Sequence, residues 1–484
     1  MEFSLMNSFL LFISFILLFG FGSYLISWFY TKDFDLTKTY YLLANRGLNL
    51  GESSFSIAAT WVWVPALFVS VQQAYVNGWI GLFWFTVPNI LCLIAFAYFA
   101  VRIRDRFPSG FTLSSFMKKV YDSNRIQNIY WVTLIGLTVC AFAVQLLAGG
   151  TLITKITGLP FFASTVLLAI LPFAYSFVFG LKSSVITDFV KIIFLFLLGG
   201  VLIPYTISNI GGVDSIIAGL GGKEGKLLDF FSENSWNLFL TFGFPITIGL
   251  MSGPFGDQAF WQRAFAVKKE QIKRSFLNAA FIFGAVPIMM GVMGLAAAGF
   301  PELNITNKQL ANVETIFYGA GLTGVVVFFM MTMSVITSII DSKMCSVSSI
   351  AGHDIAERFN LTFLTSARVS IILLTIGAVL IANIPGLTVL HLFLFYGTLR
   401  SATLLPTVLT LMDRKFKESH LFYGILSAII IGLPIFSYGN INKLPLVSVT
   451  GSLLTLFLPI AFGLFFIKKE STAVSGLDFV PDAK

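Results

Sequence analysis

The stretch FSIAATWVWVPALF, from Phe55 to Phe68, places two tryptophans and a proline in the middle of an apolar run. Tryptophan is enriched at the two ends of membrane helices, where its ring meets the lipid headgroups. Proline lacks a backbone N–H and interrupts the hydrogen-bond ladder of a helix. A membrane helix that carries all three near its centre is therefore predicted to be broken there.

The rest of the chain predicts an all-α integral membrane protein. Of its 484 residues, 56% are hydrophobic and 11% are charged, whereas soluble domains contain about 25% charged residues. Apolar runs long enough to cross a bilayer recur from end to end. The net charge of +8 comes without an RGG tract, a zinc-ligand cluster or a basic helix, so we expect no nucleic-acid partner. The cysteines form no CxxC pair and are predicted to be buried thiols.

We predict a single transporter domain over residues 1–484 with about thirteen membrane spans, each roughly 20 residues long. The predicted spans are 8–30, 54–76, 79–101, 127–150, 161–181, 184–207, 236–258, 275–299, 314–342, 367–384, 387–411, 419–437 and 446–467. The run 8–30 is too long for a signal peptide and is predicted to be an additional N-terminal helix. Two additional helices are expected over 419–467, followed by a short cytoplasmic tail, 468–484.

The distribution of Lys and Arg sets the expected orientation. Basic residues concentrate in alternate connections, such as 102–126 and 259–274, and are sparse in the connections between them. Cytoplasmic loops of membrane proteins carry this excess. We therefore predict a multi-pass protein of the plasma or inner membrane, with its N-terminus outside and its C-terminus in the cytoplasm.

A second interrupted span lies five spans after the first. It reads GFPITIGLMSGPFGDQ, from Gly243 to Gln258, and is rich in glycine and proline. Transporters often place such a pair at corresponding positions of two inverted repeats, with the binding site at the breaks. This pattern predicts two inverted five-helix repeats, 54–207 and 236–411. The alternative is that these residues are only the glycines and prolines common in membrane helices.

Polar residues inside the spans point to an ion site. Asp188 lies in FGLKSSVITDFVK, and one helical stripe holds hydroxyl and carboxylate residues, namely Ser334, Thr337, Ser338, Asp341 and Ser342. Hard oxygen ligands of this kind suit a small hard cation, and ionisable groups within a membrane are usually functional. Alternatively, the hydroxyls bond only to their own backbone or to a neighbouring helix.

At these motifs the chain resembles the sodium:solute symporter family over about residues 38–415. The stretches FGLKSSVITDFVK and IIDSKMCSVSSIAGHDI are similar to two of its signatures. TWVWVPALFVSVQQAYVNGWIGLFWF, from Thr60 to Phe85, and GDQAFWQRAFA, from Gly256 to Ala266, resemble its urea-active permease branch. The resemblance implies an amino-acid:sodium symporter-like fold with a five-plus-five inverted repeat.

The resemblance also implies a sodium site between the first break and the polar stripe. Its ligands would be the carbonyls of Ala58 and Trp61, the backbone of Val335 and the hydroxyl of Ser338. The family's second hydroxyl falls on Ile339, which cannot ligate an ion. Three readings follow: Thr337 compensates, Asp188 approaches from the sixth span, or protons drive transport instead of sodium.

The solute is expected beside the ion. The candidate residues offer aromatic faces and hydrogen-bonding groups, and they are Trp61, Trp63, Gln72, Gln73, Trp84, Asp257 and Gln258. Flat rings stack on planar molecules and amides exchange hydrogen bonds with them, so a small, planar, neutral polar solute is expected. Urea is the first candidate, and other small amides and zwitterions also fit. Lys343 is expected to pair with Asp341 or to reach the cytoplasmic surface, and Arg400 to pair or cap rather than to bind an anion.

The leading hypothesis is a secondary active transporter that couples the entry of a small polar organic solute to a cation, sodium or a proton, by alternating access. A passive channel and a sensor on the same fold are the alternatives. No nucleophile–base or metal constellation predicts an enzyme, and we expect no organic cofactor. The expected partners are the solute and the lipid bilayer, with no obligatory protein partner.

Overall fold

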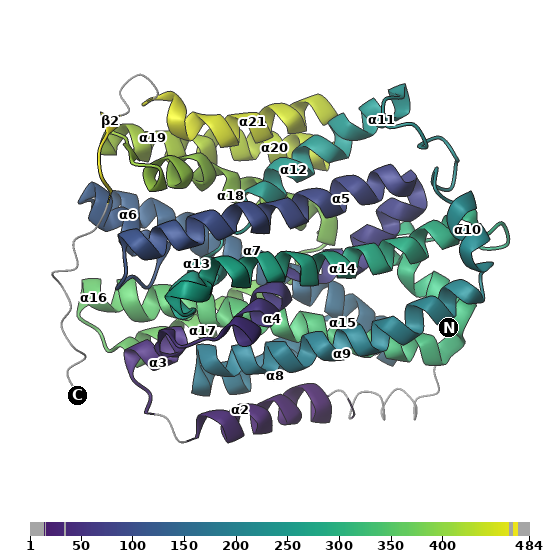
Figure 1. Cartoon of the computed structure of the whole chain (residues 1–484), viewed down its shortest axis with the longest axis horizontal. Helices are drawn as coiled ribbons and strands as arrows, with labels where there is room; N and C mark the ends of the chain where they lie inside the picture. Colours follow the sequence, from purple (N-terminus) through teal and green to yellow (C-terminus); the bar gives the residue numbers. More distant parts are fainter. Residues whose placement is uncertain (1–13, 15, 33–34, 464–467, 473–484) are drawn as a thin grey trace.

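The computed structural model describes residues 14, 16–32, 35–463 and 468–472. Parts of the predicted first span, 8–30, and most of the predicted tail, 468–484, lie outside the described residues. Long helices running side by side make up almost all of the described chain (Figure 1). The two-residue strands β1 (Arg414–Lys415) and β2 (Lys468–Lys469) pair antiparallel at one end of it.

The helices before residue 220 correspond to the first predicted repeat and the segments that flank it. They are α2 (Ser23–Thr31), α3 (Lys38–Leu43), α4 (Leu50–Trp61), α5 (Val64–Arg106), α6 (Leu113–Tyr121), α7 (Asn124–Thr157), α8 (Phe161–Phe179), α9 (Leu181–Ser208) and α10 (Gly212–Ala218). An Asn49–Glu52 capping box starts α4, because each side chain bonds the other residue's backbone N–H.

The later helices cover the second predicted repeat and the C-terminal spans. They are α11 (Glu233–Leu238), α12 (Phe244–Met251), α13 (Gln258–Ala266), α14 (Ile272–Gly299), α15 (Ala311–Ser349), α16 (Ala356–Phe359), α17 (Phe363–Ala382), α18 (Val389–Leu411), α19 (Glu418–Ser427), α20 (Leu433–Ile441) and α21 (Pro445–Ala461). Short 3₁₀ or π turns join several of them: η1 (Ile16–Gly22), η2 (Ala44–Arg46), η3 (Phe239–Gly243), η4 (Lys269–Gln271), η5 (Lys308–Leu310), η6 (Ile350–Ile355) and η7 (Ala428–Gly432).

Nine helical stretches among the described residues are long and apolar enough to cross a membrane, and α21 is a shorter apolar helix. The division into thirteen spans differs from this count partly because the predicted spans 54–76 and 79–101 lie on α4 and one continuous element, α5. The seventh predicted span is also divided, into helices too short to cross alone. Membrane-spanning helices are therefore present, while the count of thirteen stays a prediction.

The long element α5 doubles back at Gly78. The indole Nε1 of Trp61 donates to the backbone oxygen of Asn89 at 3.2 Å, whereas 28 residues of straight helix would hold these residues about 40 Å apart. Gly78 has φ +60°, and a Cβ there would lie 2.1 Å from the Leu220 oxygen. Only glycine fits this turn, which returns α5 alongside the break that precedes it.

The core that positions the site is formed by α4, α5, α9, α14 and α15. In Figure 1, α14 lies between α5 and α9, while α19–α21 and α2 lie at opposite edges. The core is not purely apolar: Arg263 and Arg400 are among its largest fully buried side chains. Buried charges inside a membrane protein are costly unless paired, so these arginines mark the region to examine for function.

Candidate functional site

The first break falls where the sequence predicts it. α4 ends at Trp61, α5 starts at Val64, and Val62 and Trp63 between them are extended, with ψ of 92° and 167°. Pro65 lies in the first turn of α5, where its missing N–H is tolerated. The free N–H of Val64 donates to Gln145 Oε1 on α7 at 3.3 Å, so a neighbouring helix supports the opened backbone.

The second break packs directly onto the first. α12 ends at Met251 and α13 begins at Gln258, with turns between them. A Cβ on Gly253 would lie 2.2 Å from the Trp61 ring, and one on Gly256 would lie 2.3 Å from the Arg400 Cβ. Both glycines therefore permit a backbone approach that no other residue allows, and the two interrupted helices meet at Trp61.

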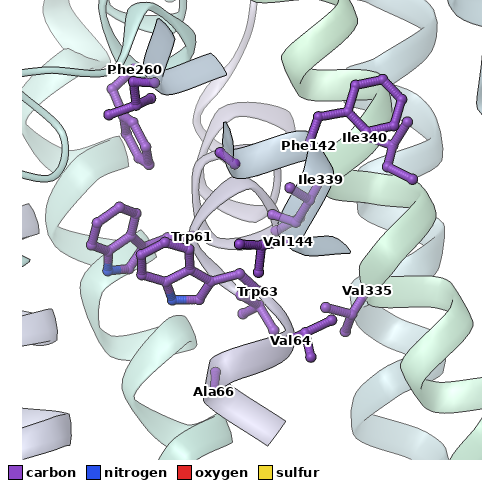
Figure 2. Packing of buried hydrophobic residues seen from close by; sticks show 14 of the residues in the cluster. Trp61, Trp63, Val64, Ala66, Phe142, Val144, Phe260, Val335, Ile339 and Ile340 are labelled. Carbon is purple, nitrogen blue, oxygen red and sulfur yellow. The ribbon is translucent and has the colours of Figure 1, made fainter. Parts of the chain in front are cut away.

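Two indoles form the wall of this junction. The rings of Trp61 and Trp63 stack at 4.9 Å and 26° (Figure 2). Trp63 also meets Phe393 of α18 edge-on at 4.9 Å, and its buried Nε1 has no hydrogen-bond partner. The Trp61 N–H, in contrast, is bound to Asn89. Of the two, Trp63 keeps a polar group available at the break.

Arg400 faces the same rings from α18. Its guanidinium carbon lies 5.6 Å from the Trp61 ring, 5.4 Å from Trp63 and 5.2 Å from Tyr396. The side chain is 1% exposed, and its Nε and Nη2 have no hydrogen-bond partner. Among the described residues Arg400 forms no ion pair, so the expectation that it pairs or caps is wrong: aromatic faces surround it, and the carboxylate of the adjacent break, Asp257, is bound by Lys343.

A small cavity lies beside the break, towards α9 and α15. It has a volume of about 10 Å³, and its lining residues are Ala59, Val62, Lys191, Ile192, Leu195, Ser334, Val335 and Ser338. Val335 and Ser338 are among the proposed sodium ligands, and the cavity adjoins the opened segment after Trp61. Ala58, another proposed ligand, uses its carbonyl to accept the Val62 N–H at 2.8 Å.

The carboxylate of Asp188 is fully enclosed by partners. It accepts hydrogen bonds from Ser56 at 2.7 Å and from the Ser338 hydroxyl, and forms an ion pair with Arg263 at 3.1 Å. Arg263 also donates to Ser342 at 2.8 Å. Both charged side chains are 0% exposed. Asp188 thus joins α4, α9, α13 and α15, with a guanidinium as its counter-ion.

A second buried carboxylate, Asp341, pairs with Lys191 at 3.0 Å. It also accepts from Tyr175 and Ser184, each at 2.7 Å. The polar stripe of α15 therefore divides: Ser338, Asp341 and Ser342 join these networks, whereas the hydroxyls of Ser334 and Thr337 bond to backbone oxygens of their own helix. The backbone-bonding alternative holds for those two residues.

Lys343 pairs with Asp257, not with Asp341 and not with the cytoplasmic surface. Asp257 caps α13, since its side chain accepts from the Ala259 N–H at 3.0 Å. Its neighbour Gln258 bonds the Leu113 N–H and the Phe111 oxygen, each at 3.1 Å, and so fastens α13 to the segment before α6. Both residues have structural partners at the second break.

Three proposed solute residues lie apart from this junction. Gln73 accepts from Asn77 at 2.6 Å near the Gly78 turn, and Gln72 precedes it. Trp84 packs against Phe239 and Phe230, in a separate aromatic cluster near α11. Sequence proximity grouped these residues with Trp61, but Gln72 and Gln73 continue along α5 towards the Gly78 turn, and the Trp84 ring packs in the other aromatic cluster.

The sequence did not single out several members of the buried networks: Ser56, Tyr175, Ser184, Lys191 and Arg263. Lys191 stands three residues after Asp188, and Arg263 lies inside the WQRA run. The rule that ionisable groups within a membrane are functional applies to both. A search of the sixth span for cations would have found Lys191, whereas Arg263 falls in the predicted connection 259–274, outside the predicted spans.

Comparison with known proteins gives a match to one family model. The family model of the sodium:solute symporter family matches residues 41–432. This chain belongs to the sodium:solute symporter family. The first predicted repeat, both breaks and the networks around Asp188 and Asp341 all fall within the matched range.

Among curated members, the chain is 23% identical to a probable urea active transporter 3 of Schizosaccharomyces pombe, over 88% of this chain and 70% of the relative. It is 22% identical to a urea-proton symporter of Oryza sativa subsp. japonica, over 84% of this chain and 62% of the relative. The chain therefore spans about two thirds of the length of these family members.

One solved structure shares the fold with a TM-score of 0.75. It is a Na⁺-coupled sialic acid symporter in a substrate-bound outward-open state, 15% identical, and the match covers 96% of this chain and 99% of that one. At this identity the likeness establishes the arrangement of helices and leaves the ligand to be argued from the residues.

Proposed function

We propose that this family member is a secondary active transporter that couples the entry of a small polar organic solute to a cation by alternating access. The single observation that carries the proposal is the meeting of two interrupted helices at Trp61, where Gly253 approaches the ring. Breaks of this kind expose backbone groups inside a membrane, and such exposure is tolerated only where protein or a cavity satisfies them.

The cation acts between α4, α9 and α15. The cavity of about 10 Å³ touches all three helices, through Ala59 of α4, Lys191 of α9 and Ser338 of α15. A cation held there would tie the opened segment to α15, and its release would let the two parts separate. The predicted repeats 54–207 and 236–411 would move against each other in this way, with the N-terminus outside and the C-terminus in the cytoplasm.

Sodium is the first candidate for the coupling ion, because family members are sodium:solute symporters and a hydroxyl oxygen suits it. A proton is the second candidate, and one observation favours it. The ammonium of Lys191 lines the same cavity and would repel a second cation bound there. The buried carboxylates Asp188 and Asp341 would then hold and release protons instead.

The solute is proposed to contact the indole pair. The fungal and the plant relative are both named as urea transporters. It is planar and polar, and Trp61 and Trp63 form a flat stacked surface at the break. Urea is therefore the first solute to test.

Uptake into proteoliposomes tests the proposal. The purified chain is reconstituted, and labelled urea is offered with an inward sodium gradient, with an inward proton gradient, or with neither. Accumulation above the outside concentration under one gradient identifies the coupling ion and excludes a channel. Ser338→Ala should weaken the sodium dependence, whereas Ser437→Ala on α20 serves as a matched control. Equilibration without accumulation under every gradient contradicts active transport.

A further inference from the structure

We propose that Arg400 binds the carboxylate of the transported solute, so that the substrate is a small organic carboxylate. This inference rests on the proposed transport function and replaces urea, which sequence similarity favours, with an anion. The balance of buried charges around the two breaks supports it.

Around the two breaks, four buried cations face three buried carboxylates. Three buried ion pairs, Asp188–Arg263, Asp341–Lys191 and Asp257–Lys343, satisfy each other. Arg400 forms no ion pair within the part of the chain that the structure describes, although it is 1% exposed. Asp257, the acidic residue of the adjacent break, is already bound by Lys343. A buried unpaired guanidinium is destabilising, and a mobile anion is the partner that the fold lacks.

The unsatisfied groups around Arg400 are mainly donors. Its Nε and Nη2, the Nε1 of Trp63 and the hydroxyl of Tyr396 are all buried without a partner. Ring centroids place Trp63 and Tyr396 5.8 Å apart, with Arg400 within 5.4 Å of each. Gln145, which supports the opened backbone at Val64, also has an unpartnered amide nitrogen.

This donor set distinguishes a carboxylate from urea. A carboxylate only accepts hydrogen bonds, through two oxygens, and a guanidinium fork matches both of them. Urea offers one accepting oxygen and four N–H donors, which would need acceptors. Asn89 Oδ1, in the residue that binds the Trp61 N–H, is an unpartnered acceptor and suits one hydroxyl or amine elsewhere on the solute.

The room for a solute lies between α12 and α18. A cavity of about 10 Å³ separates these helices, and its lining residues are Pro245, Ile246, Gly249, Leu250, Phe393, Leu394, Gly397 and Arg400. That volume holds about one water molecule, so a solute enters only when the helices part. A Cβ on Gly249 would lie 3.5 Å from the Gly397 Cα, so this wall is lined by backbone. Binding of an anion would remove the penalty of the buried charge and favour the closed form.

The test compares carboxylates with their uncharged amides on the unmodified protein. Detergent-purified full-length chain is titrated with pyruvate, acetate and benzoate, then with pyruvamide, acetamide, benzamide and urea, and melting temperature and tryptophan fluorescence are recorded. We expect at least one carboxylate to bind about tenfold or more tightly than its amide, as for a charge-assisted hydrogen bond. Amides or urea binding as tightly as every carboxylate, or no carboxylate binding at all, overturns the proposal.

Variants then locate the site. Arg400→Gln should abolish the carboxylate effect, Arg400→Lys should weaken it because the fork is lost, and Arg125→Gln, at an exposed position, should retain it. If Arg400→Gln does not fold, the Arg400→Lys comparison and the carboxylate–amide pairs still decide. Carboxylate binding that survives in Arg400→Gln overturns the proposal. Carboxylate binding that requires Arg400 without gradient-driven uptake keeps the anion site and contradicts active transport.

Discussion

Buried charges are paired on the α9–α15 side of the junction, whereas on the α18 side the buried charge of Arg400 is unpaired within the part of the chain that the structure describes. On the first side Asp188 and Asp341 each have a cation and two or more hydroxyl partners. On the second side Arg400 has aromatic rings and no counter-ion. A satisfied network holds helices together, whereas an unsatisfied charge is available for a ligand. The paired residues on the first side therefore stabilise the structure, whereas Arg400 on the second side is available to bind the solute.

Replacing one arginine on each side of the junction gives the largest expected difference in the free energy of unfolding. Arg263→Met leaves Asp188 charged, buried and unpaired, so we expect a loss of about 3–5 kcal/mol of unfolding free energy. Arg400→Met removes a buried charge that already lacks a counter-ion, so we expect no destabilisation of the solute-free protein. Thermal and denaturant unfolding in detergent measure both.

The double variant Asp188→Asn/Arg263→Met is the control, because it removes both charges and should recover much of the loss. Equal destabilisation by the two single arginine variants would contradict the distinction between the two sides.

An added side chain at the contact between the two breaks should be tolerated less well than one on an ordinary helix surface. Gly253→Ala places a methyl group 2.2 Å from the Trp61 ring, and we expect a loss of about 1–3 kcal/mol from overpacking together with impaired uptake. Gly200→Ala on α9 meets nothing within 4 Å and serves as the control. Melting temperature and uptake are measured for both. Unchanged uptake by the Gly253 variant would show that the breaks need not touch.

Lys191→Met tests whether the ammonium group of Lys191 excludes sodium from the cavity between α4, α9 and α15. Asp341 keeps its hydroxyl donors in this variant, and the cavity loses a positive charge. We expect sodium to raise the melting temperature at concentrations about tenfold lower than in the unmodified protein. Lys155→Met, at an exposed position on α7, should leave the sodium response unchanged. If Lys191→Met behaves like this control, the ammonium does not govern ion access.

The smallest effect is expected outside the spans, at Asp413. Partial burial raises the pKa of this carboxyl, but hydrogen bonds from Arg106 and the Thr472 backbone outweigh it, so the net pKa is lowered. A lowered pKa stabilises the fold above the unfolded value of about 4, and this stabilisation is lost as the pH falls through the folded value. Asp413→Asn should therefore lose about 1 kcal/mol or less near neutral pH and show a flatter acid limb in thermal melts. An unchanged acid limb would contradict the role of Asp413.

The sequence alone determined the membrane class, both breaks and the polar stripe on α15. These features are local: apolar length sets a span, and proline and glycine interrupt a helix wherever they stand. Asp188 and Ser338 were found for the same reason, since an ionisable or hydroxyl group in an apolar run stands out in one dimension. These motifs lie within residues 41–432, the range that the family model matches.

Only the tertiary structure decided which charges meet. Lys343 pairs with Asp257 across 86 positions rather than with nearby Asp341, and the reversal at Gly78 brings Asn89 back to Trp61 across 28 positions. Arg400 was expected to pair or cap rather than to bind an anion. Whether a counter-ion exists depends on every helix packed around it, and no spacing along the chain reports that. Pairing is a property of three-dimensional neighbours, so the sequence located the junction and the fold identified Arg400 as its unsatisfied group.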